Sequence, residues 1–371
     1  MTDFRIPTHV RVAPGCSAAL SETAKQLNAK RVLFITDAGL LEGPLVFAAL
    51  ALLDAANMPV ELYGEVESNP RTTTAEHIAS LANPGDVLVG FGGGSVIDAA
   101  KAAAMLATNK GGVGAWLGKN VFDEDPLPFI AVPTTCGTGS EVTWVSVLTD
   151  EARNIKISIK GTQMFPSVAL VDADLIGGLP AHLIVSTGLD ALTHALEATT
   201  GSVRNPVSDA MAEKSIALTF EFLARAARDP KGDGEAREAI MRASTLAGLA
   251  FGNADVAGVH CLSESLGGLY DVPHGLANAL LLAPVMRSHG KHVEGRLREL
   301  KSLCLRREST QGFMDQLETL IGELNLPDNS CLGIVAGEER RIAELAVANG
   351  SNGSNPRVMG IDEYLAILEE L

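Results

Sequence analysis

The sequence has few of the features that would place it outside the cell or in a membrane. Its five cysteines are scattered and none forms a CxxC pair, so a disulfide framework or a zinc ribbon is not expected. The opening MTDFRIPTHV lacks the basic and apolar regions of a signal peptide. Apolar runs such as VFAALALL and ALLLAPVM are far shorter than the ~18 residues of a membrane helix. These absences favour a soluble protein of the reducing cytoplasm.

Basic residues are also scarce. Lys and Arg number 29 against 45 Asp and Glu, which gives a formal net charge of −16. Such a surface repels nucleic acid and anionic membranes, so small molecules are the expected partners. With 46% hydrophobic and 20% charged residues the chain should fold. A length of 371 residues exceeds one ordinary core and predicts two domains.

The two halves of the chain differ in pattern. Short β-rich runs at 31–37, 86–91 and 128–134 alternate with helical stretches, and their near-continuous apolar character predicts a parallel sheet covered by helices on both faces. From Ala181 onward the composition and the 3.6-residue period are helical. Gly177, Gly178 and Pro180 mark the change. We therefore expect an α/β domain over residues 1–178 and an all-α domain over residues 179–371.

Two glycine-containing loops follow strands of the first half. In GDVLVGFGGGSVIDAAKAAAML (85–106) the glycines allow close backbone approach, Ser95 can cap the next helix, and the helix N-terminus can face a phosphate. Ser95 replaces the third glycine of the dinucleotide fingerprint, so a tight turn without a ligand stays open. A second loop, PTTCGTGSE (133–141), also follows a strand. Together the loops favour a dinucleotide site at the carboxyl edge of the sheet.

Asp37 ends the first clear strand. A carboxylate there could accept from a ribose 2′-OH and repel a 2′-phosphate, or it could simply cap the next helix.

The segment GLDALTHALE puts Asp190 and His194 four residues apart, which places them on one face of a helix. His260 and His274 follow in another apolar helical region. Ionisable groups in such surroundings need partners, and one divalent cation would satisfy one carboxylate and three imidazoles together. The alternative for each histidine is a hydrogen-bonded core residue.

The motifs GGGSVIDAAK, PTTCGTGSEVT, GLDALTHALEA and VPHGLANALLLAPVM, in this order, closely resemble the iron-containing (group III) alcohol dehydrogenases. The resemblance spans nearly the whole chain. It implies a dehydroquinate synthase-like fold, in which a Rossmann-like domain binds NAD(P), an all-helical domain holds one divalent metal, and the active site lies between them. It also suggests a homodimer.

Carried over by position, the resemblance implies three groups of site residues. The metal ligands would be Asp190, His194, His260 and His274. The cofactor site would use Asp37, Asn69, Gly93, Gly94, Ser95, Thr134, Thr135, Thr143, Lys156 and Leu175. Phe251 matches a substrate-pocket aromatic residue.

The chain departs from the family pattern at two places. Relatives commonly carry a second histidine, thought to relay the substrate proton, where this chain has Glu264. The stretch around Trp144 and Val145 also differs, so the family does not fix the substrate. If residues 254–268 are helical, Glu264 lies one turn beyond His260 and could relay a proton, or it could turn to solvent or orient a ligand histidine.

These observations predict an NAD-dependent, metal-activated alcohol dehydrogenase or aldehyde reductase that acts on a small alcohol or aldehyde. The metal is expected to be Fe(II), although histidine and carboxylate ligands suit Zn(II) nearly as well. One alternative is a lyase resembling dehydroquinate synthase, which would want several Lys or Arg residues around a phosphate-bearing substrate. Others are a reductase of a specialised oxo-acid such as maleylacetate, or a cofactor-binding protein without catalysis, which would need a broken metal set.

Overall fold

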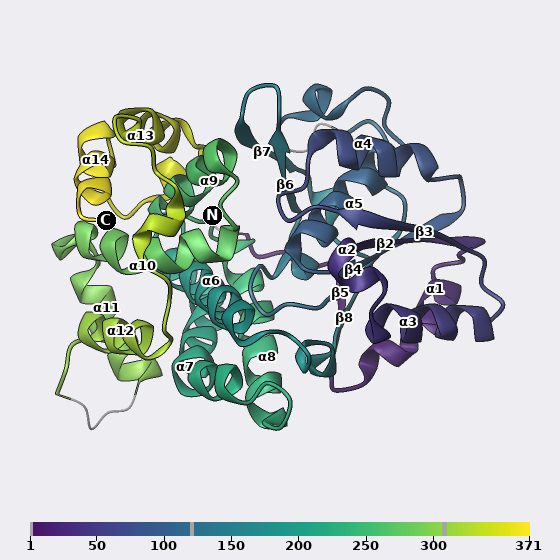
Figure 1. Cartoon of the computed structure of the whole chain (residues 1–371), viewed down its shortest axis with the longest axis horizontal. Coiled ribbons are helices and arrows are strands. Elements are labelled where there is room, and N and C mark those ends of the chain that lie inside the picture. The colour runs from purple at the N-terminus through teal and green to yellow at the C-terminus, as the bar shows by residue number, and fades with distance from the viewer. Residues whose placement is uncertain (1–2, 119–121, 306–309) are drawn as a thin grey trace. The chain divides into compact units, whose positions relative to one another are not determined.

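The computed structural model describes residues 3–118, 122–305 and 310–371, and the chain divides into two compact units (Figure 1). Ile6–Thr135 and Gly139–Gly177 form the α/β unit. Gly178–Leu371 form the helical unit, which also includes residues 3–5 and Cys136–Thr138.

A six-stranded parallel sheet forms the centre of the α/β unit, in the order β1-β8-β5-β4-β2-β3. The strands are β1 (His9–Val12), β2 (Arg31–Asp37), β3 (Val60–Val66), β4 (Asp86–Gly92), β5 (Phe129–Pro133) and β8 (Val168–Val171). An antiparallel hairpin, β6 (Val145–Asp150) and β7 (Ile155–Lys160), stands apart from the sheet. β3 pairs with one edge of β2, and β4, the next strand in the chain, pairs with its other edge. The strand order therefore reverses between β2 and β4. Ligands of open α/β sheets bind at such a reversal, beyond the carboxyl ends of the strands.

Helices cover both faces of this sheet, as expected from the apolar strands. They are α1 (Leu20–Gln26), α2 (Ala38–Leu41), α3 (Pro44–Ala55), α4 (Thr72–Leu81) and α5 (Gly94–Leu106). Val32 and Phe34 of β2 pack in one core with α1 and α3, whereas Leu33 and Ile35 pack in the other with α4 and α5. In Figure 1, α1 and α3 lie on one side of the sheet and α4 and α5 on the other. Successive side chains of β2 thus point to opposite faces, and both faces are buried.

The loop between β4 and α5 is closely packed. A Cβ at Gly92 would lie 2.5 Å from the Val96 side chain, and a Cβ at Gly93 would lie 3.2 Å from Thr135. The expectation that Ser95 caps α5 is wrong, since the N-cap is Gly93 and no side chain caps the helix. Ser95 lies in the first turn, and its hydroxyl donates to the Ser68 carbonyl. The first N–H groups of α5 therefore have no side-chain cap competing with a ligand.

The helical unit contains nine α-helices within the described ranges. They are α6 (Ala181–Thr200), α7 (Pro206–Arg228), α8 (Gly234–Phe251), α9 (Gly258–Tyr270), α10 (His274–His289), α11 (Lys291–Cys304), α12 (Phe313–Glu323), α13 (Glu339–Ala348) and α14 (Ile361–Glu369). Local signals set several ends. Asn205 and Ser208 form a capping box ahead of α7, and Asp233 caps α8.

A parallel α/β domain followed by an all-helical domain is the fold class expected from the sequence, and it is confirmed. Among the described residues, no helix combines the length and the apolar character needed to cross a bilayer.

Candidate functional site

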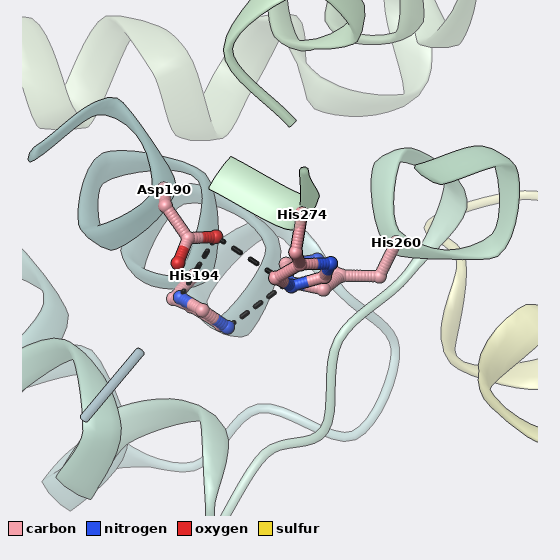
Figure 2. A group of neighbouring side chains, drawn as sticks. All are labelled: Asp190, His194, His260 and His274. Atoms are coloured by element: carbon pink, nitrogen blue, oxygen red, sulfur yellow. Dashed lines mark hydrogen bonds and ion pairs between the residues drawn. The ribbon is translucent and has the colours of Figure 1, made fainter. Parts of the chain in front are cut away.

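Four side chains of the helical unit converge on one point (Figure 2). Asp190 and His194 come from adjacent turns of α6, His260 comes from α9, and His274 is the first residue of α10. Each offers one ligand atom, and these atoms all lie within 4.8 Å of one another. Asp190, His194 and His260 are buried and His274 is partly exposed. The four residues are called the metal-donor group below.

The distances in the metal-donor group suit one cation. Nε2 of His260 lies 2.9 Å from Nε2 of His194, and Oδ1 of Asp190 lies 3.7 Å from Nε2 of His274. Two donors that share a divalent ion at about 2.1 Å are themselves roughly 3 to 3.5 Å apart. The residues present therefore fit a divalent metal.

The protonation of His194 agrees with this fit. Burial lowers the pKa of His194 to about 3, in spite of the Asp190 carboxylate, so the ring is neutral at pH 7 and keeps a lone pair for a metal. Its Nδ1 is buried and makes no hydrogen bond to any described residue. Two ring nitrogens 2.9 Å apart, those of His194 and His260, cannot both carry protons. A cation between them would accept a lone pair from each nitrogen.

Glu197, which was not among the residues predicted from the sequence, holds His260 in this position. Its Oε2 lies 2.6 Å from Nδ1 of His260 and accepts from the Ala257 N–H, while its Oε1 accepts from the Val259 N–H at 2.6 Å. Because Nδ1 donates to this buried carboxylate, the lone pair of Nε2 faces the metal-donor group. Ligand histidines regularly have such a partner. The available signal was the spacing 190, 194, 197, which is one helix face.

Asn278 is a second residue that the sequence analysis missed. It is buried one turn after His274 on α10. Its Nδ2 donates to Oδ1 of Asp190 at 2.6 Å and lies 3.1 Å from Nε2 of both His260 and His274. An amide in the otherwise apolar run ANALLLAPVM was the signal.

Phe251 and Glu264, the predicted substrate and relay residues, both lie near this group. Phe251 ends α8 and stacks on His194, with ring centroids 4.2 Å apart. Glu264 is half-buried on α9, one turn after His260, and its Oε2 accepts from Nδ2 of Asn349 at 2.6 Å. The acceptor for His260 Nδ1 is Glu197, not Glu264.

The predicted cofactor residues lie in the α/β unit, and most follow the carboxyl ends of its parallel strands. These positions are Asp37 at the end of β2, Asn69 after β3, Gly93, Gly94 and Ser95 after β4, Thr134 and Thr135 after β5, and Leu175 after β8. Five strand ends thus contribute to one edge of the sheet. Leu175 is buried in the core on the short helix η5 (Ala173–Ile176).

Two predicted cofactor residues far apart in sequence are in direct contact. Lys156 of β7 donates from Nζ to Oδ1 of Asn69 at 2.6 Å. Thr143, just ahead of β6, is buried and accepts from the ammonium of Lys101 at 3.2 Å. A side-chain hydrogen bond thus joins the hairpin to the residue after β3, and another joins Thr143 to α5.

Asp37 caps α2, which is the simpler of its two predicted roles. Its Oδ1 accepts from the N–H groups of Gly39 at 2.9 Å and Leu40 at 3.1 Å. Burial raises the pKa of Asp37, while these backbone hydrogen bonds act to lower it.

Comparison with known proteins agrees with this architecture. The family model "Iron-containing alcohol dehydrogenase" matches residues 7–173, and "Fe-containing alcohol dehydrogenase family, C-terminal" matches residues 184–371. Alcohol dehydrogenase 4 of Schizosaccharomyces pombe is 34% identical over 99% of this chain and 88% of its own. The NAD-dependent methanol dehydrogenase of Bacillus methanolicus is 31% identical over 100% of this chain and 99% of its own. A crystal structure of 1,3-propanediol oxidoreductase matches with a TM-score of 0.93 at 33% identity. The match covers 100% of this chain and 99% of that one.

The two-unit fold and the metal-donor group are typical of oxidoreductases that use a nicotinamide cofactor and a divalent metal. The chain belongs to the iron-containing alcohol dehydrogenase family. It is an oxidoreductase that acts on CH–OH groups, and the family uses NAD and a divalent metal. The lyase and the oxo-acid reductase alternatives are not favoured by these findings.

Proposed function

We propose that this chain interconverts a small alcohol and its aldehyde with NAD, and that Asp190, His194, His260 and His274 hold the divalent metal that activates the substrate. The observation that carries the proposal is the convergence of these four donors within 4.8 Å in a mostly buried setting. The relatives support the substrate class, since they include alcohol, methanol and 1,3-propanediol dehydrogenases.

The reaction divides between bound groups and protein residues. When bound, the metal supplies Lewis acidity that favours loss of the hydroxyl proton, and the nicotinamide supplies the hydride acceptor. Glu197 keeps the proton of His260 on Nδ1 and so aims its Nε2 at the metal-donor group. Phe251, stacked on His194, shields that ring and offers an apolar surface to the carbon chain of the substrate.

Glu264 is our candidate for the proton relay in place of the family's second histidine. Three observations support it: its position one turn after His260, its half-buried carboxylate, and its hydrogen bond from Asn349. The other role considered for Glu264 was to accept a hydrogen bond from a ligand histidine. At His260 the acceptor is Glu197 instead.

The cofactor is proposed to bind along the carboxyl edge of the sheet, on the ten residues named above. The uncapped N-terminus of α5 would face the pyrophosphate. Asp37 would also accept a hydrogen bond from the ribose 2′-OH. Its N-cap hydrogen bonds use only Oδ1, and each carboxylate oxygen has more than one lone pair. A carboxylate there favours NAD over NADP.

Iron(II) is our proposed metal, and membership of the iron-containing family supports it over Zn(II). We also propose a cytoplasmic homodimer. The free state of all five cysteines supports a reducing compartment.

The test is a substrate screen. The apoprotein is loaded anaerobically with Fe(II) or Zn(II), and NADH absorbance is followed with methanol, ethanol, 1,3-propanediol and longer alcohols. Turnover that needs both metal and NAD is expected, with the preferred alcohol named by kcat/KM. Absence of NAD-linked turnover with every alcohol and aldehyde, at full metal occupancy, would overturn the proposal.

A further inference from the structure

A hydrogen bond joins the C-terminal part of the helical unit to Glu264, the proposed relay. Nδ2 of Asn349 donates to Oε2 of Glu264 at 2.6 Å, although the two residues are 85 positions apart. Within the described ranges no other group donates to this carboxylate and no basic side chain pairs with it. A hydrogen bond to a carboxylate is about twice as strong as one between neutral groups, so Asn349 is the main constraint on where this carboxylate lies.

The orientation of the Asn349 amide is fixed from its other end. Asn349 is the N-cap of the short helix η7 (Gly350–Ser354), and its Oδ1 accepts from the Ser351 N–H at 2.9 Å. An amide oxygen can accept from that N–H, whereas an NH2 group cannot. The cap therefore requires the NH2 group to face Glu264, and this sets the direction of the hydrogen bond.

The Asp255 carboxylate attaches η7 to the start of α9. Its Oδ1 accepts from the Ser351 hydroxyl at 3.0 Å and its Oδ2 from the Ser354 hydroxyl at 2.8 Å. Asp255 lies just before α9, and both η7 and α13 pack against that helix. The segment that carries Asn349 is therefore fixed, at a second point, to the helix that carries Glu264.

The contact divides the Glu264 carboxylate into two different oxygens. Oε2 accepts from Asn349, whereas Oε1 accepts from no residue that the structure describes. A free glutamate side chain samples several rotamers, and this freedom has to be lost before a proton can pass at a fixed position. One oxygen is thus held, and the other is available for a proton.

We propose that Asn349 is a positioning residue for the proton relay: its amide holds Oε2 of Glu264 so that Oε1 receives the proton of the alcohol. The inference rests on the proposed relay role of Glu264. In alcohol oxidation the hydroxyl proton passes to Oε1 and the hydride passes to NAD, which leaves the aldehyde. Asn349 exchanges no proton in this step.

The two residues form a matched pair. A carboxylate at position 264 needs a donor at position 349, and the Asn349 amide supplies it. A histidine at position 264 would need an acceptor there instead. If one ring nitrogen of a neutral imidazole accepts from an amide, the other carries the ring proton and has no lone pair for the proton of the substrate.

The test uses the Fe(II)-loaded protein with NAD and whichever of methanol, ethanol, 1,3-propanediol and longer alcohols has the highest kcat/KM. Asn349→Ser keeps an N-cap for η7 but shortens the side chain that reaches Glu264, and Asn349→Asp keeps the cap but replaces the donor by a second carboxylate. We expect kcat to fall about tenfold in each, a part of the roughly 10²- to 10⁴-fold that positioned proton transfer contributes. The solvent deuterium isotope effect on kcat should increase, while metal content and the KM for NAD stay near wild type.

A paired exchange tests the match directly. Glu264→His alone should lower kcat about 100-fold, because Asn349 would donate to one ring nitrogen and leave the ring proton on the other. Adding Asn349→Asp supplies an acceptor for the ring proton, so the double variant should be about tenfold faster than Glu264→His. If both residues were only structural, the double variant would be as slow as the slower single variant or slower.

Asn329→Asp is the matched control. The Asn329 amide also donates to a group far along the chain, the Leu371 carbonyl at 2.8 Å. The substitution removes a donor of the same kind and adds the same charge without touching Glu264. Its kcat and its isotope effect should equal those of the wild type.

The outcomes separate the role of Asn349 from the relay on which it rests. Wild-type kcat in Glu264→Gln would show that the relay is wrong, and the role of Asn349 would fall with it. If Glu264→Gln loses kcat, two results would leave the relay in place and overturn the positioning role. One is wild-type kcat in Asn349→Ser, and the other is a double variant no faster than Glu264→His.

Discussion

The metal-donor group of the helical unit and the cofactor residues of the α/β unit are held by different kinds of interaction. In the helical unit, ionisable side chains on α6, α9 and α10 lie close to one another, and the Glu197 carboxylate accepts a hydrogen bond from His260. In the α/β unit, the proposed contacts are mostly glycines, threonines and backbone groups after the ends of strands.

This difference predicts how each unit responds to substitution. A charged or imidazole group taken from a buried cluster leaves its partners unpaired, which is costly. One side chain lost from a set of backbone-dominated contacts leaves the other contacts in place. We therefore expect large losses from the metal-donor group and modest losses from the cofactor residues.

The largest effect is expected for His274→Ala. Loss of one donor from the group should lower metal content under anaerobic loading far below that of the wild type. Since a Lewis acid supplies several kcal/mol to the transition state, kcat/KM should fall about 10³-fold or more. The control is His289→Ala, which removes a buried imidazole from the other end of the same helix and should keep its metal. Equal metal content in His274→Ala and wild type would refute the ligand assignment.

Glu264→Gln comes next. It keeps the shape and one acceptor for Asn349 but removes the group that would carry the proton, so a relay predicts a fall in kcat of about 100-fold with metal retained. The pH profile of kcat should lose one ionisation. Loss of metal would assign Glu264 to ligand support instead, and unchanged kcat across pH would exclude both roles.

Glu197→Gln is expected to weaken metal binding by about 10- to 100-fold, the range usual for partners of ligand histidines. An amide cannot accept from His260, Ala257 and Val259 as two carboxylate oxygens do. Metal affinity is measured by competition with a chelator, and Glu323→Gln on the exposed side of α12 is the control. Wild-type affinity in Glu197→Gln would show that the contact does not orient His260.

The metal-donor group was predictable because its signal is local. Ionisable residues on apolar helices stand out, and the i, i+4 spacing of Asp190 and His194 fixes their common face. Glu197 and Asn278 were missed because each has an ordinary helical explanation as a single residue. Their role depends on which helices pack together, and a helix period does not contain that information.

The α/β unit shows the same limit. Strand runs and glycine loops predicted the parallel sheet and the β4–α5 turn. The predicted serine cap of α5 was wrong because the N-cap position lies two residues before Ser95, at Gly93. The contact between Lys101 and Ser140 was not predictable from sequence, because the two residues are about 40 positions apart. Contacts between residues so far apart in the sequence depend on the fold as a whole.

The smallest effect is expected for Asp37→Gly, which tests the cofactor preference. Glycine is nearly as good an N-cap as aspartate, costing only a few tenths of a kcal/mol, so α2 should survive the change. The variant loses the charge that would repel a 2′-phosphate, so the ratio of kcat/KM for NAD to that for NADP should fall about tenfold. Asp54→Asn, which removes an exposed charge from α3 of the same unit, should leave the ratio unchanged. If the wild type prefers NADP, or if Asp37→Gly keeps the wild-type ratio, the role of Asp37 is confined to capping α2. A shift much larger than tenfold would mean that a single side chain dominates cofactor choice, and the contrast between the two units would then fail at this position.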